Sequence, residues 1–158
     1  MTDRVERLEA KKQEIKESYE MTLSSLEKTK LRRYNVMDRE LENKIFFYSI
    51  RIKKLNINLT LLEQKLEKLR LQRMDADEDK IAEVGNQIDR VMTDCSIIQK
   101  KIDEIHNKQR DAGLSVDKAK EVLERTMNHR KEVLLSKFNN SMSYYDTKIA
   151  KERANQEN

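Results

Sequence analysis

A seven-residue repeat is clearest in residues 45–69, which read IFFYSIRIKKLNINLTLLEQKLEKL. Apolar side chains recur there at alternating steps of three and four residues. Steps of this kind place side chains on one stripe of an α-helix, and a sustained seven-residue period is typical of a coiled-coil seam. The full series is Leu31, Tyr34, Leu41, Ile45, Tyr48, Ile52, Leu55, Leu59, Leu62, Leu66 and Leu69. It predicts one long helix over about residues 3–73.

A second series with the same alternation follows in residues 81–105. Its members are Ile81, Val84, Ile88, Val91, Cys95, Ile98, Ile102 and Ile105. The two series are out of frame by one residue, and the acidic sequence RMDADED at 73–79 lies between them. Asp75 and Glu78 have the spacing of a capping box, and carboxylates favour a helix N-terminus. We therefore predict a chain reversal near residues 74–78 that joins two antiparallel helices.

The flanking segments follow an eleven-residue period, which keeps a helix pair nearly straight. Ile15, Leu26 and Met37 recur at this spacing in the N-terminal part of the chain. Three further rows follow the second seven-residue series: Val116, Met127, Phe138 and Ile149; Leu123, Leu134 and Tyr145; and Val122, Val133 and Tyr144. Folding the chain near residue 75 opposes residues whose numbers sum to about 150. The two seven-residue segments then pair with each other, and so do the two eleven-residue segments. The expected fold is an all-α, elongated antiparallel helical hairpin or coiled coil that forms one domain over 1–158.

The charge distribution agrees with this pairing. Residues 41–75 contain eight basic and four acidic side chains, whereas residues 76–112 contain six basic and nine acidic ones. In the predicted hairpin these two segments face each other, so that charges at the edges of the seam meet opposite charges.

Gly113 leaves the returning part of the chain open to two interpretations. A glycine followed by Leu114, Ser115 and Asp117 can end one helix and cap the next. The returning part would then consist of helices over about 76–112 and 115–153, and an elongated three-helix bundle is the alternative fold. Otherwise Gly113 is a kink within one returning helix.

The composition argues against a catalytic protein. Charged residues make up 39% of the chain and aromatic residues 5%, proline is absent, and the two glycines form no phosphate-binding loop. His106 and His129 are not spaced as metal ligands, and a thin helical rod lacks a concave cleft. We expect no enzymatic activity, no cofactor, no metal and no small-molecule substrate.

The sequence also bears on the compartment. The first ten residues alternate charged and apolar side chains, unlike a secretory signal, and the longest apolar-rich run, residues 45–50, is too short to span a bilayer. Cys95 is the single cysteine and cannot form an internal disulfide. We expect an intracellular protein of a reducing compartment, cytoplasmic or nuclear, that is neither secreted nor transmembrane.

Five apolar residues of the first helix fall outside the seam, on its back. They are Phe46, Phe47, Ile50, Ile57 and Leu61, and we call them the docking strip. A two-helix hairpin cannot cover both faces of its first helix, and an exposed apolar patch marks a binding site. A third segment of the same chain, another copy or another protein could cover the strip. We expect a protein partner, in a homo- or hetero-oligomer.

Two basic clusters are candidates for contact with an anionic partner. They comprise Lys28, Lys30, Arg32 and Arg33, and then Arg51, Lys53 and Lys54. Charge runs on a coiled coil usually form its solvated face, and nucleic acid or an anionic membrane is the alternative partner. The function expected from the sequence is a structural scaffold or spacer in a cytoskeletal, tethering, chromosome-associated or virus-particle assembly. Peripheral binding to an anionic surface is the second hypothesis.

Overall fold

The structure, a computed structural model, describes residues 2–157. These residues form two helices and no strand: α1 spans Thr2–Met74 and α2 spans Glu78–Glu157. The chain divides into two compact units, which we describe separately. Unit 1 comprises Met1–Met37 and Asp117–Asn158, and unit 2 comprises Asp38–Val116.

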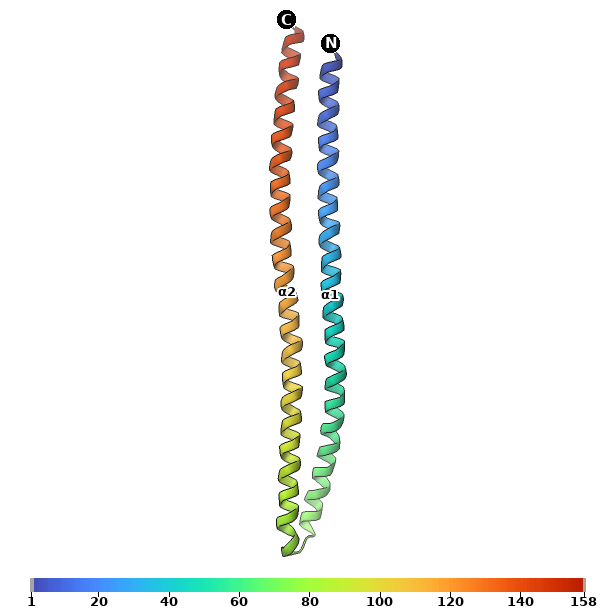
Figure 1. Cartoon of the computed structure of the whole chain (residues 1–158), viewed down its shortest axis with the longest axis vertical. Coiled ribbons are helices and arrows are strands. Elements are labelled where there is room, and N and C mark those ends of the chain that lie inside the picture. Colours follow the sequence, from blue (N-terminus) through green and yellow to red (C-terminus); the bar gives the residue numbers. More distant parts are fainter. Residues whose placement is uncertain (1, 158) are drawn as a thin grey trace. The chain divides into compact units, whose positions relative to one another are not determined.

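The two helices lie antiparallel within each unit (Figure 1). The predicted all-α helical hairpin is therefore confirmed. The absence of proline from the chain explains why the helices can be so long, because proline removes a backbone donor and clashes with the preceding turn.

The reversal lies where the sequence predicts it, at Asp75–Asp77, but its cap differs from the prediction. The Asp77 carbonyl accepts hydrogen bonds from the amides of Lys80 (2.9 Å) and Ile81 (3.0 Å), which makes Asp77 the N-cap of α2 in place of Asp75. The Asp75 amide instead donates to the Gln72 carbonyl (3.2 Å) and closes the end of α1. No described residue has a positive φ angle, so this reversal does not require a glycine.

Of the two interpretations of Gly113, the one in which it ends one helix before another begins is wrong, and so is the three-helix alternative. Helix α2 continues through Gly113, Leu114 and Ser115. A glycine that ends a helix usually adopts the left-handed conformation, and Gly113 does not.

The register differs from the prediction by one repeat. Leu69 of α1 packs with Ile88 and Val91 of α2 in a buried cluster in unit 2. Leu69 and Ile88 have numbers that sum to 157, not to about 150. The first member of the second series, Ile81, is still 44% exposed, because the first turn of α2 completes the reversal before packing begins.

Unit 1 follows the eleven-residue period. Leu123, Met127 and Ile149 are buried, and the Tyr19 ring stacks on Phe138 with centroids 4.3 Å apart. The third predicted row is exposed instead: Val122 (59%), Val133 (40%) and Tyr144 (54%). The predicted seam residue Leu31 is also exposed, at 57%. The eleven-residue frame, which persists to Leu41, turns Lys30 toward α2 in place of Leu31.

Candidate functional site

The docking strip is exposed on α1 in unit 2. Relative exposures are 62% for Phe46, 65% for Phe47, 60% for Ile57 and 58% for Leu61, and Ile50 is partly buried. The seam residues Tyr48, Ile52 and Leu55 are less exposed than these, because they face α2. The strip therefore occupies the side of α1 on which an isolated helix pair normally presents polar residues.

The two phenylalanines form the aromatic end of the strip. The rings of Phe46 and Phe47 contact each other edge to face, with centroids 6.2 Å apart and an interplanar angle of 65°. This arrangement is favourable for aromatic quadrupoles and restricts both side chains. A partner would thus meet anchors that are already partly ordered.

Two shallow grooves run beside the strip. The first is lined by Lys53, Asn56, Ile57, Thr60 and Leu61. The second is lined by Phe46, Ser49, Ile50, Ile52, Lys53, His106 and Gln109. Gln109 of α2 forms part of the wall of the second groove. Hydrogen bonds hold its side chain against α1, because its Nε2 donates to Ser49 Oγ (3.3 Å) and to the Ile45 carbonyl (3.4 Å).

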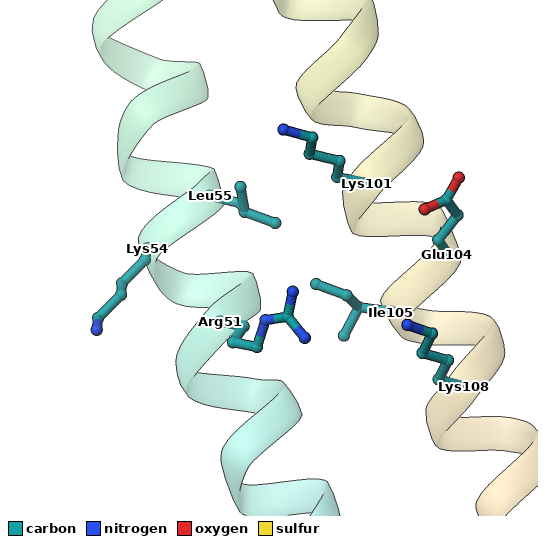
Figure 2. A pocket seen from close by; sticks show the side chains of 7 residues that line it. All are labelled: Arg51, Lys54, Leu55, Lys101, Glu104, Ile105 and Lys108. Atoms are coloured by element: carbon teal, nitrogen blue, oxygen red, sulfur yellow. The ribbon is translucent and has the colours of Figure 1, made fainter.

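A separate basic groove lies between the helices of unit 2. It is lined by Arg51, Lys54, Leu55, Lys101, Glu104, Ile105 and Lys108. Figure 2 shows Arg51 and Lys101 reaching into the space between the helices, whereas Lys54 points away from α2 and Glu104 points away from α1. The lining of the groove thus combines basic side chains with two apolar ones, Leu55 and Ile105.

The structure divides the basic residues predicted to contact an anionic partner. Arg51 and Lys54 line the basic groove, and Lys53 lines both grooves beside the docking strip. Lys28, Arg32 and Arg33 are exposed on α1. Lys30 differs from the rest, because its side chain is only 18% exposed and pairs with Glu124 within unit 1. Its charge is therefore used inside the helix pair.

Lys30, Tyr34 and Glu124 form a polar cluster that sequence reasoning missed. Lys30 Nζ lies 2.8 Å from Glu124 Oε2. The ammonium groups of Lys30 and Lys120 lie 5.7 Å and 5.4 Å from the centroid of the Tyr34 ring. Lys30, and then the Tyr34 hydroxyl, lower the pKa of Glu124 by stabilising its carboxylate. The same hydrogen bond from Lys30 raises the pKa of Lys30 above its usual value. Extending the eleven-residue frame through Leu26 would have placed Lys30 on the inner face.

The α2 side of both grooves was also missed. Lys101, His106, Lys108 and Gln109 are far in sequence from their α1 neighbours, and Gln109 lies 60 positions from Ser49. Spacing along one helix does not show which residues of the other helix lie opposite, so these neighbours cannot be assigned until the register is known. Lys101 and Lys108 are separated by one seven-residue repeat, and this was the only signal that they share a side of α2.

Other kinds of site are not seen in the described residues. No group of three or more His, Cys, Asp or Glu side chains in residues 2–157 could hold a metal ion. Neither α1 nor α2, over its described length, includes a stretch apolar enough to cross a bilayer. Comparison with protein-family models, with curated proteins and with solved structures found no match to the chain.

Proposed function

We propose that the chain is a non-enzymatic structural protein that docks onto a protein partner through the docking strip and acts as a scaffold or spacer in a larger assembly. One observation carries this proposal: Phe46, Phe47, Ile57 and Leu61 are each 58–65% exposed on a single helix. Burying each such side chain contributes about 1.5–3 kcal/mol, and aromatic anchors dominate many interfaces. The single cysteine, Cys95, supports placing this function in a reducing compartment.

The mass of the native particle tests the proposal. The chain is isolated under native conditions from the cells that produce it, and light scattering gives the particle mass. We expect a particle heavier than the 18.9 kDa of one chain. Phe46→Glu combined with Ile57→Glu should reduce the mass to that of one chain, because two carboxylates would have to be buried.

A matched control separates this effect from added charge. Asn86→Glu combined with Thr93→Glu adds the same charge at exposed positions seven residues apart on α2. This variant should keep the heavier mass, and circular dichroism should show the same helicity for both variants. A wild-type particle of one chain, or a heavy particle that survives Phe46→Glu with Ile57→Glu, contradicts the proposal.

The basic groove supports a second candidate function, peripheral binding to nucleic acid or an anionic membrane. Arg51 and Lys101 face the same space, and neither pairs with a carboxylate in the described structure. The test is binding to duplex DNA and to phosphatidylserine vesicles at low salt. Affinity should fall steeply as salt rises and should weaken in Arg51→Ala with Lys101→Ala. No binding to either probe removes this candidate.

A further inference from the structure

We propose that the docking strip binds an amphipathic helix of a different protein, in which acidic residues interrupt the apolar stripe and face Lys53 and Lys54. This inference rests on the proposed function, because it names the partner of the same surface. It is carried by the two lysines that lie between the halves of the strip and by the two grooves beside it.

The strip consists of two apolar halves with lysines between them. Phe46, Phe47 and Ile50 form the first half, and Ile57 and Leu61 form the second. The two lysines occupy the turn that separates Ile50 from Ile57, and Lys53 lines both grooves. Any partner that covers both halves must therefore also cover the lysines.

Neither lysine forms an ion pair within the described residues 2–157. In unit 1, Lys12, Lys30 and Lys131 each pair with a carboxylate of the opposite helix. In the described structure no carboxylate lies within ion-pair distance of Lys53 or Lys54. Residues 43–62 include four basic residues and no acidic one. Burying these ammonium groups is costly unless the partner supplies carboxylates.

The dimensions and lining of the strip fit a helix. Phe46 and Leu61 are separated by about 22 Å along α1 at 1.5 Å per residue, which corresponds to four turns of a partner helix. The grooves run on the same side of α1, and Gln109 of α2 extends one of them. Amphipathic helices bind such surfaces by inserting apolar anchors spaced three, four and seven residues apart.

A second copy of the chain does not satisfy these charges. A two-fold axis that brings the strip onto itself passes midway between Phe46 and Leu61, which is between Lys53 and Lys54. The lysines of the two copies would then face one another, and like charges in direct apposition are destabilising. Self-association is therefore disfavoured on this surface.

A lipid surface also fits less well. Helices that lie on membranes have a continuous apolar face with basic residues on the polar side. Here Lys53 and Lys54 interrupt the apolar face itself, so that they would enter the acyl region together with Ile50 and Ile57. A protein helix can instead place a carboxylate at that level.

Photo-cross-linking in cells that produce the protein tests the inference. Thr60→benzoylphenylalanine places a photoreactive group in one groove without removing an apolar anchor, and Thr93→benzoylphenylalanine on α2 is the matched control. Both threonines are exposed and donate to the carbonyl four residues earlier. We expect a discrete adduct from position 60 alone, and mass spectrometry should identify the cross-linked segment as an acidic amphipathic helix of another protein.

Charge variants make the test specific. Lys53→Glu with Lys54→Glu should lower the adduct yield about tenfold or more, whereas Lys53→Arg with Lys54→Arg should keep it, since the second pair retains the charges. An adduct with the chain itself, with lipid, or with a segment that lacks acidic residues overturns the inference, as does a yield insensitive to charge reversal. If such an adduct is lost in Phe46→Glu with Ile57→Glu, docking through the strip stands and only the acidic-helix partner fails.

Discussion

The Tyr34 hydroxyl donates a 2.7 Å hydrogen bond to Oε2 of Glu124, which lies ninety positions later in the chain. Lys30 Nζ donates to Oε1 of the same carboxylate at 3.0 Å. One glutamate of α2 thus receives two donors from consecutive turns of α1. A contact of this kind stabilises one register of the helix pair over its neighbours, because a shift by one turn would leave all three polar groups without these partners.

The ion pairs of unit 1 predict a stability that falls at both extremes of pH. The pKa of Glu27, lowered by Lys131, and that of Glu124, lowered mainly by Lys30, lie below the usual 4.5. The unfolded chain therefore takes up protons first, and stability is lost as the pH falls below about 4.5. Hydrogen bonds raise the pKa of Lys12 and Lys30 above 10.5, so stability is also lost as the pH rises through that range.

Thermal unfolding followed by circular dichroism measures this dependence. Glu124→Gln should lower the Tm at neutral pH and flatten the acid limb of the profile, because the titrating carboxylate is gone. Glu20→Gln is the control, since Glu20 is an exposed glutamate of the same unit that forms no ion pair within the described residues. Equal Tm values for Glu124→Gln and wild type across the acid range would refute the role given to this cluster.

Methionine truncation should separate the interior of unit 1 from its surface. Met127 is 1% exposed and Met21 is 74% exposed. Met127→Ala should lower the free energy of unfolding by about 2–5 kcal/mol through lost burial and a cavity. Met21→Ala should change it by less than about 0.5 kcal/mol. Urea denaturation measures both values, and similar losses for the two variants would show that the helices do not pack as described.

Both glycines should tolerate alanine with a gain in stability. A Cβ added at Gly85 or Gly113 meets no atom within 4 Å, and neither residue has a positive φ angle. Each substitution should raise the free energy of unfolding by about 0.5–1 kcal/mol, since alanine loses less backbone entropy in a helix. Urea denaturation again provides the measurement. Destabilisation by Gly113→Ala would instead indicate that α2 is broken there.

Cross-linking to Cys95 tests the register in unit 2. Leu62 and Cys95 both pack against the Leu69 cluster, whereas the register first expected from the sequence pairs Cys95 with Leu55. Leu62→Cys should form an intrachain link with Cys95 through a short bis-maleimide, because the two side chains lie at the same level. Leu55→Cys should link poorly, since it lies about 10 Å further along the helix axis at 1.5 Å per residue. Peptide mapping identifies the linked pairs. Preferential linkage from position 55 would contradict the register described above and favour the one in which paired residue numbers sum to about 150.

The sequence predicts the pairing of the helices better than their register. Leu69, Ile88 and Val91 are recognisable as inner residues because their three-four spacing requires one helical stripe. The register is ambiguous for the same reason, since shifting one seven-residue series past another by a full repeat preserves every apolar layer. Numbers that sum to 150 and to 157 differ by one such repeat. The geometry of the reversal at Asp75–Asp77 and polar contacts such as Tyr34 with Glu124 select between them.

The course of the chain at Gly113 and the inner residue near position 30 could not be predicted, because the residues there are compatible with two structures. Gly113 can end a helix or continue one, and packing decides which. Both repeat frames contain Tyr34, but the seven-residue frame selects Leu31 and the eleven-residue frame selects Lys30. The exposure of Phe46 and Ile57 was predictable, because neither fits the seam in any register. The basic groove was not, since Lys101 joins Arg51 only across the helix pair.

The distance along the chain between contacting residues has a consequence for folding kinetics. Leu69 and Ile88 are separated by 19 positions, whereas Arg4 and Glu152 are separated by 148. Closing a longer loop costs more conformational entropy, so contacts beside the reversal should form first and shorten the loop for those that follow. We therefore expect substitutions at Leu69 or Ile88 to slow refolding, and substitutions at Tyr19 or Phe138 mainly to accelerate unfolding.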